Sequence, residues 1–254
     1  MLSVTASTGP RTVAIHQPNF FPWLGYFDKL ARSDVFVLLD HAQYPKTGGS
    51  WSNRVKLLLS GEARWMTAPI VRSVHGVRAI ADVEFQPANP WREKFVKSLR
   101  ASYSRARHFH DSMAWLEPLI TNPDPSLARY NAAAIVAIAE QLGIATRGIQ
   151  WSSSMPIREQ STNMLIEVTR LVGADAYLCG GGAAGYQDDA AFAAASIALT
   201  YQHFRHPTYD QGPDRPFTPG LSIIDAVMHL GIDGVRDLLQ VPSTQWPREG
   251  GACR

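Results

Sequence analysis

The chain of 254 residues is somewhat longer than a usual domain of about 100–200 residues, which leaves room for one α/β domain with an added helical segment. Hydrophobic residues make up 45% of the chain and charged residues 18%, and this composition excludes an intrinsically disordered protein. The formal net charge of +2 gives no reason to expect a nucleic acid or an anionic membrane as a partner.

The first predicted elements form a strand–helix–strand unit. The apolar run Val13–Ile15 predicts a buried strand, and two prolines soon after it predict an irregular loop. Apolar residues at helical spacing predict a helix from Trp23 to Arg32, and the apolar run Val35–Leu39 predicts the next strand. In such a unit the first loop lies at the carboxyl edge of a parallel sheet, where α/β proteins bind ligands.

A hairpin and a mainly helical segment follow in the sequence. Residues 40–54 are rich in Gly and Pro and predict a loop on the same edge. Two apolar-rich runs, at 55–59 and 63–70, flank a Gly turn and predict a hairpin, and residues 83–85 predict a further short strand. Helical patterns at 91–103 and 131–142 predict the middle of the chain to be mainly helical.

The alternation of strand and helix returns in the last third. Strands are predicted at 146–151, 176–179 and 197–201, with helices at 161–172 and at 222–230, the last ended by Gly231. The predicted fold class is α/β, a Rossmann-like parallel sheet with flanking helices, a β-hairpin insertion and a mainly helical middle segment. We expect one domain over residues 13–240 with a helical insertion at about 88–145, between a flexible N-terminus (1–12) and a flexible tail (241–254).

Cysteine usage and hydropathy bear on location. Cys179 lies in an apolar run and Cys253 next to the C-terminal residue, and two such cysteines predict no disulfide framework and fit a reducing compartment. Residues 1–12 lack the apolar stretch of a signal peptide, and no segment approaches about 18 uncharged apolar residues. We therefore expect a cytoplasmic protein without a membrane span.

The loop after the first strand carries the first candidate functional cluster. Residues 16–27 read His-Gln-Pro-Asn-Phe-Phe-Pro-Trp-Leu-Gly-Tyr-Phe, which places polar and aromatic side chains before a helix N-terminus. Free N–H groups at a helix start attract phosphate or carboxylate. The same residues also fit a structural role, in which His16 and Gln17 satisfy buried backbone groups while Trp23 and Tyr26 belong to the core.

This run resembles the opening of the WbqC-like family, whose members similarly begin with His-Gln-Pro-Asn and Pro-Trp-Leu-Gly-Tyr-Phe before a strand that ends in Asp. The resemblance continues from Val13 to Gly231, in the segments 44–46, 51–54, 161–165, 177–186, 204–209 and 221–225. The sequence departs from the family where a single Asn53-Arg54 pair is followed by Val55. The resemblance implies an enzyme that acts on an activated small molecule in surface-glycan or secondary-metabolite biosynthesis.

Two more distant resemblances bear on mechanism. The order of strand, Pro-containing loop, helix and strand is similar to the nucleotidylyltransferase superfamily, but Trp23 and Tyr26 stand near the places of its two signature histidines. Neither Trp nor Tyr carries a positive charge at neutral pH, so they cannot neutralise phosphate in the same way. The segment from Met164 to Asp188 resembles the pantothenate synthetase stretch that approaches the nucleotide and the acyl intermediate. This second resemblance implies an ancestry in amide or acyl transfer.

Two further loops offer binding groups. Lys46, Arg54 and Lys56 supply two ammonium groups and one guanidinium that suit the capture of phosphate or carboxylate, with a solvated basic loop as the alternative. Gly180–Gly182 directly follows a strand, so the backbone there could approach a ligand closely.

The candidate catalytic residues are His16, Tyr26 and His206, because an imidazole titrates near neutral pH and can move a proton. The candidate substrate-binding residues come from the same loops and strand ends, and they are Gln17, Asn19, Trp23, Lys29, Asp40, Lys46, Asn53, Arg54, Ser161, Asn163, Gly180, Gly181, Gly182 and Tyr186. The sequence has neither a zinc-binding spacing of Cys and His nor a Gly-x-Ser-x-Gly elbow, so we expect no metal site and no Ser-His-Asp hydrolysis.

The leading hypothesis is a transferase that moves an acyl or aminoacyl group onto an amine. Its partners would be a small-molecule substrate such as a sugar nucleotide, and a nucleotide-activated or thioester donor on an acyl carrier protein. The alternatives are a nucleotidyltransferase or ATP-dependent ligase-like enzyme, and a noncatalytic small-molecule-binding protein. The transfer hypotheses require that His16 and Arg54 face a shared cavity on one rim of the sheet.

Overall fold

The computed structural model of the protein describes residues 9–45, 49–72, 77–181, 187–213 and 215–240. Residues 1–8 and the tail of residues 241–254 lie outside the described residues, so the predicted flexibility of the two ends stays a prediction. Thr12, the last residue of the predicted N-terminal segment, already belongs to the first strand.

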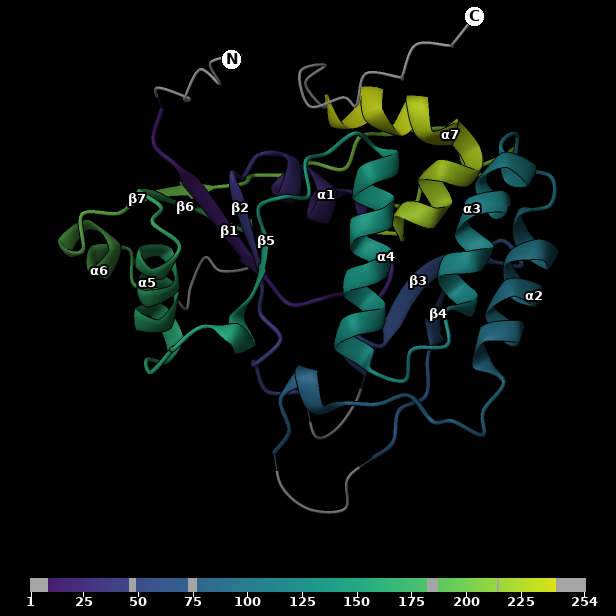
Figure 1. Ribbon diagram of the computed structural model, residues 1–254. Coiled ribbons are helices and arrows are strands. Elements are labelled where there is room, and N and C mark those ends of the chain that lie inside the picture. The colour runs from purple at the N-terminus through teal and green to yellow at the C-terminus, as the bar shows by residue number, and fades with distance from the viewer. Residues whose placement is uncertain (1–8, 46–48, 73–76, 182–186, 214, 241–254) are drawn as a thin grey trace, which may run out of the picture.

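A five-stranded parallel sheet forms the centre of the fold, in the order β5-β2-β1-β6-β7 (Figure 1). Its strands are β1 (Thr12–His16), β2 (Val35–Leu38), β5 (Ile149–Trp151), β6 (Ala176–Cys179) and β7 (Ala198–Tyr201). The central strands are short apolar runs buried along their length, as expected where helices cover both faces of a parallel sheet. The structure confirms the predicted Rossmann-like α/β class.

Alternate residues of the central strands face two separate cores. Val13, Ile15 and Val37 pack on one face with the helices α5 (Ser161–Leu171) and α6 (Asp189–Ala194). Ala14 and Leu38 pack on the other face with α1 (Leu24–Ala31) and the helical part of the chain. The sheet is therefore the middle layer of three.

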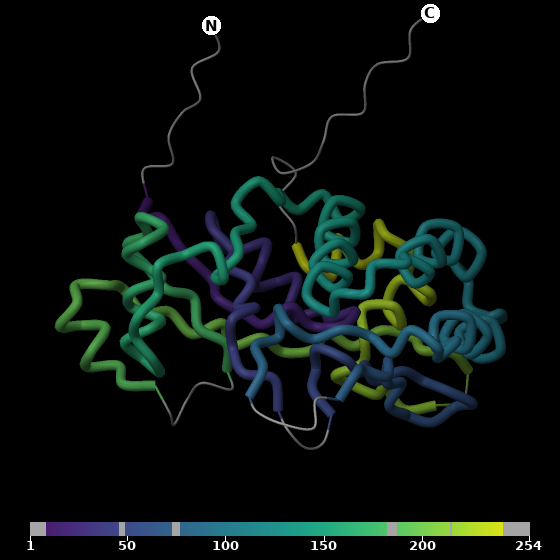
Figure 2. The backbone as a smooth tube through the Cα atoms, turned by 60° about the horizontal axis from the view of Figure 1, so that its bottom comes forward, coloured from purple at the N-terminus to yellow at the C-terminus, as the bar shows by residue number. Residues whose placement is uncertain are grey.

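The helical part of the chain lies at the opposite end of the molecule from α5 and α6, as Figures 1 and 2 both show. It contains α2 (Trp91–Tyr103), α3 (Phe109–Thr121), α4 (Leu127–Gln141) and α7 (Ile223–Leu239). The predicted hairpin is present as β3 (Arg54–Leu59) and β4 (Glu62–Thr67), which pair antiparallel apart from the main sheet. Both α2 and α7 pack against β3.

Several elements differ from the sequence prediction. α3 and α6 have no counterpart in it, and α4 begins four residues early because the Ser126 side chain caps it by accepting a bond from Arg129 N. The predicted strand at 83–85 is wrong, because these residues make only isolated bridges after the 3₁₀ turn η1 (Ile80–Asp82). A second short turn, η2 (Ser152–Ser154), follows β5.

The last helix does not end at Gly231 as predicted. Gly231 has a φ of 70° and interrupts the helical geometry, but a further helical segment runs on to Leu239. A Cβ at this position would lie 2.8 Å from the His108 ring, so the close approach of the α2–α3 connection requires glycine. The residue therefore marks a kink rather than an end.

The order of the strands reverses at β1, because β2 lies on one side of it and β6 on the other. Ligands of open α/β sheets bind beyond the carboxyl ends of the strands at such a reversal. The residues that directly follow β1 and β6 meet this description, and we use the name switch-point crevice for the place between these two strand ends where this fold class binds ligands. No helix in the described part of the chain has the length and apolar character needed to cross a membrane.

Candidate active site at the carboxyl edge of the sheet

The loop after β1 is held by hydrogen bonds from three other parts of the chain. Phe20 N donates to Trp51 O at 2.8 Å, and Ile223 N donates to Pro22 O at 2.8 Å. The buried Asn131 side chain donates from Nδ2 to Pro18 O at 2.9 Å. The loop is therefore fixed against the basic loop, α4 and the start of α7, and its side chains have defined positions.

A series of ring contacts connects this loop with the basic segment on the hairpin. The His16 ring lies 5.7 Å from Trp23, and Trp23 lies 5.4 Å from Trp51, both measured between ring centroids. Trp51 lies 4.9 Å from Trp65, and the Arg54 guanidinium stacks over Trp65 at 4.3 Å. The structure thus brings His16, Trp23 and Arg54 into one connected aromatic and basic surface. Trp51 and Trp65 were not among the predicted site residues.

His16 and Tyr26 are both uncharged at neutral pH. Burial lowers the pKa of His16 to about 3, the nearby Lys29 lowers it further, and the contact of Nδ1 with Gln17 O opposes the shift. Burial raises the pKa of Tyr26 well above its usual range, and its hydroxyl donates to Gln17 O at 3.2 Å. The two rings lie 4.8 Å apart, and Tyr26 is 1% exposed and belongs to the hydrophobic core, so its ring packs behind His16 as the structural alternative predicts.

Lys29 places a buried ammonium group in the switch-point crevice. Its side chain is 3% exposed, and Nζ donates to Ile15 O at 2.9 Å, one residue beyond the last pair of β1 with β6. A Cβ on Gly180 would come within 4.0 Å of Nζ, so the ammonium lies against the start of the loop after β6. Burial lowers the pKa of Lys29 to about 8, and Cys179 opposes the shift. Among the described residues no carboxylate lies within ion-pair distance of Nζ.

Asp40 and Asn53 use their polar atoms to shape loops. Asp40 is buried, and its Oδ1 accepts from Ser152 Oγ and from Ser153 N, both at 2.9 Å, which ties the loops after β2 and β5 together. Asn53 accepts from the Tyr44 hydroxyl at 2.7 Å and donates to Ala68 O at 3.0 Å. These bonds show that both residues shape the loops at the edge of the site.

Asn19 differs from these two, because its Oδ1 is buried and has no hydrogen-bond partner among the described residues. The buried Ser52 Oγ and Asn131 Oδ1 beside the same loop have none either within that part of the chain. Buried polar atoms normally find a protein, water or ligand partner. Asn19 therefore keeps an acceptor available next to the site.

The other predicted residues lie on α5, beside the site, or outside the described residues. Ser161 and Asn163 are exposed in the first turn of α5, and no contact within the described ranges joins them to the crevice. His206 is partly buried, its pKa is lowered by burial, and its ring contacts Phe204, which packs against Gly25. Gly180 lies next to Lys29 Nζ, whereas a Cβ on the exposed Gly181 would meet no described atom within 4 Å. Lys46, Gly182 and Tyr186 lie outside the described residues. In the described ranges, no three His, Cys, Asp or Glu side chains are placed to hold a metal ion.

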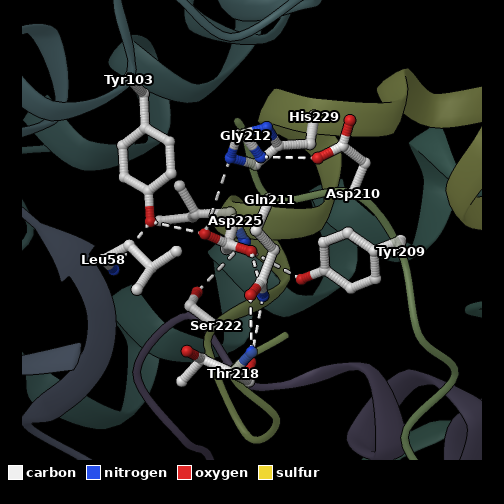
Figure 3. Close-up of polar contacts among 11 residues, drawn as sticks. Leu58, Tyr103, Tyr209, Asp210, Gln211, Gly212, Thr218, Ser222, Asp225 and His229 are labelled. Carbon is white, nitrogen blue, oxygen red and sulfur yellow. Dashed lines mark hydrogen bonds and ion pairs between the residues drawn. The ribbon is translucent and has the colours of Figure 1, made fainter. Parts of the chain in front are cut away.

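A second polar cluster was missed by the sequence analysis. Asp225 in α7 is fully buried and bonded to Tyr103, Tyr209 and Gln211 (Figure 3). The signal available in the sequence was a lone carboxylate in the apolar run of residues 223–228. Its partners come from up to 122 residues away, so only the tertiary structure shows the cluster.

Comparison with known proteins places the chain in a family. The model of the WbqC-like protein family matches residues 17–237. A curated relative from Mycobacterium tuberculosis (strain ATCC 25618 / H37Rv), "Uncharacterized protein Rv1507c", is 30% identical over 227 residues, which cover 88% of this chain and 95% of that protein. No solved structure gives a significant match. The family match spans both the loop after β1 and the helix that carries Asp225, and the chain belongs to the WbqC-like protein family.

Proposed function

We propose that the protein is a biosynthetic transferase that moves an acyl or aminoacyl group onto an amine, in surface-polysaccharide or secondary-metabolite biosynthesis. The reaction takes place at the switch-point crevice. The observation that carries this proposal is the buried Lys29 ammonium, which has only a backbone carbonyl as its hydrogen-bond acceptor among the described residues. A buried charge without a partner costs stability, and such groups cluster at functional sites.

The chemistry of amide formation matches the properties of Lys29. The acceptor amine attacks the carbonyl carbon of a thioester, so a C–N bond forms and the C–S bond breaks. Lys29 gives its proton to the departing sulfur and then takes up the proton that the amine loses. Negative charge develops first on the carbonyl oxygen and then on the sulfur, where a buried ammonium stabilises it. The pKa of Lys29, about 8, is close to the ordinary value of a thiol, about 8.5, so the proton transfer to sulfur is nearly balanced.

The neighbouring side chains fit roles in orientation. His16 has a pKa of about 3 and stays neutral, so it serves as a hydrogen-bonding group to substrate and is a weak base. The rings of Trp23 and Tyr26 contact the His16 ring edge to face and hold its orientation. Arg54, stacked on Trp65, is held in place to pair with an anionic group of the substrate, such as the diphosphate of a sugar nucleotide.

The direct test is an assay of thiol release. The purified protein is incubated with acyl-coenzyme A thioesters as donors and amino-sugar nucleotides as acceptors, and the acylated acceptor is detected by mass spectrometry. We expect both thiol release and the acceptor product, with both lost in Lys29→Met. The matched control is Lys97→Met, which removes an exposed lysine from α2 and should leave turnover unchanged.

Two results would contradict this function. Full turnover by Lys29→Met would show that the buried ammonium takes no part in the chemistry. Turnover that requires ATP or CTP with a divalent metal would instead support the nucleotidyltransferase or ligase alternative. Circular dichroism of each variant separates a loss of activity from a loss of fold.

A further inference from the structure

The cluster around Asp225 joins three elements and fixes one carboxylate (Figure 3). Tyr103, the last residue of α2, donates its hydroxyl to Oδ1 at 2.9 Å. Tyr209 and Gln211, from the segment before α7, donate to Oδ2 at 2.7 and 2.9 Å. The Tyr103 hydroxyl also accepts from Leu58 N of β3 at 2.9 Å. Both carboxylate oxygens are therefore held by uncharged donors.

His229 lies one helical turn after Asp225 on α7, with Nε2 4.0 Å from Oδ1 and a side chain that is 13% exposed. Its ring also makes an edge contact with Tyr103. Burial lowers the pKa of His229, Asp225 and Asp210 oppose this shift, and Arg215 adds to it. The imidazole thus lies beside a fixed carboxylate, and Asp210 and Arg215 are close enough to influence its pKa.

His229 lines a cleft of about 530 Å³ whose rim carries three arginines. Arg105 and Arg107 come from the turn between α2 and α3, and Arg215 comes from the segment before α7. All three are exposed, and none has a carboxylate within ion-pair distance in the described ranges. Among the described residues of the lining, Asp210 is the exposed acidic one, and its Oδ1 accepts from Gly212 N at 2.8 Å. Positive charge therefore prevails among the described residues around the cleft.

We propose that this cleft binds the phosphate groups of a small phosphorylated molecule, with the three arginines on the phosphate oxygens and His229 as a donor from the floor. Guanidinium groups match phosphate in charge and in the geometry of two parallel hydrogen bonds. The volume lies within the range of small-molecule sites, about 300–1,000 Å³, and exceeds what one phosphate needs. Asp225 acts as a positioning residue that orients the imidazole. The site does not depend on the transfer reaction proposed above.

The experiment is a calorimetric titration of the full chain with inorganic pyrophosphate. We expect binding that weakens as salt is added, and a loss of at least about tenfold in affinity in the double variant Arg107→Glu, Arg215→Glu, because each charge-assisted bond contributes more than a neutral one. The matched control is Arg170→Glu, an exposed arginine at the far end of α5, which should bind as the unmodified protein does.

The role of His229 has its own readout. Titrations in buffers of different ionisation enthalpy report proton uptake, and we expect uptake on binding that disappears in His229→Gln. Uridine diphosphate and phosphopantetheine are each tested for displacement of pyrophosphate. Displacement by the first identifies the natural ligand as a nucleotide, and displacement by the second identifies it as the phosphopantetheine group of an acyl carrier. Equal pyrophosphate affinity in the unmodified chain and the folded double variant would overturn the proposal, as would displacement by neither ligand.

Discussion

The molecule buries two charged side chains, Asp225 and Lys29, and their hydrogen bonding differs. The contrast separates a charge with a structural role from one that lacks a counter-charge in the described part of the chain. Asp225 has three side-chain donors on its two oxygens, drawn from α2 and the segment before α7. Lys29 is 3% exposed, and among the described residues its ammonium hydrogen-bonds only to one main-chain carbonyl and lies 5.9 Å from the centre of the Tyr177 ring. A fully bonded carboxylate fastens elements together, whereas a buried ammonium without a counter-charge costs stability and fits the ligand-binding role proposed above.

The largest effect is expected where the bonded charge is removed. Asp225→Ala leaves two tyrosine hydroxyls and an amide without their acceptor in a buried place, so the free energy of unfolding should fall by about 3–5 kcal/mol. Urea unfolding of the variant and the unmodified protein measures this change in the free energy of unfolding. Asp111→Ala, at an exposed position on α3, serves as the control. A fall below about 1 kcal/mol would show that Asp225 does not fasten these elements.

The opposite sign is expected for Lys29→Met. The folded-state pKa of Lys29 is about 8 against an ordinary 10.5, so the ammonium opposes folding by roughly 3 kcal/mol at pH 7, offset by about 1 kcal/mol for the bond to Ile15 O. The variant should gain about 2 kcal/mol at pH 7. As pH rises from 8 to 10.5 the unfolded chain holds the extra proton, so the unmodified protein recovers stability and the difference shrinks. A less stable variant at pH 7 contradicts this account.

A pH-dependent effect of about the same size is expected for His16→Gln. The pKa of His16 is lowered from 6.5 to about 3, so below pH 6.5 the unfolded chain binds a proton that the folded chain refuses, and stability falls on acidification. At pH 5 the unmodified protein should lose at most about 2 kcal/mol of its free energy of unfolding. His16→Gln has no imidazole to protonate and should not show this loss. Unfolding midpoints at pH 7 and pH 5 give the difference, with the exposed His110→Gln as reference. Equal losses in all three proteins would refute it.

The smallest effect is expected for Tyr209→Phe, which removes one of the bonds to Asp225 and keeps the ring. The loss should be about 1.5 kcal/mol, since two donors remain on the carboxylate. Differential scanning calorimetry resolves a change of this size. A loss as large as that of Asp225→Ala would mean that the bonds act as a single unit rather than separately.

The sheet could be predicted from the sequence because its central strands are short apolar runs between breakers. The run Val35–Leu39 cannot be solvated along its length, so it must be covered on both faces. α3 could not be predicted in the same way, because Pro118 lies inside it and argues against a helix. Gly231 looked like a helix end because the His108 ring that requires it comes from a distant part of the chain.

The candidate site was predicted only in part. The loop after β1 stood out because its prolines, aromatics and polar residues follow a buried strand. Lys29 was named as a binding residue, but its burial and its place at Ile15 O depend on how α1 packs against the end of the sheet. The series from His16 through the tryptophans to Arg54 depends on the position of the hairpin. Local sequence patterns predict neither the burial of Lys29 nor the ring contacts between His16 and Arg54.

The buried Lys29 ammonium next to Gly180 has a practical consequence for finding the substrate. Any anionic group that settles in the crevice supplies the missing counter-charge to the folded chain alone, so the melting temperature must rise with its concentration. A thermal-shift screen of metabolites would therefore rank candidate substrates before any reaction is known. The same screen on Lys29→Met would identify the hits that act elsewhere.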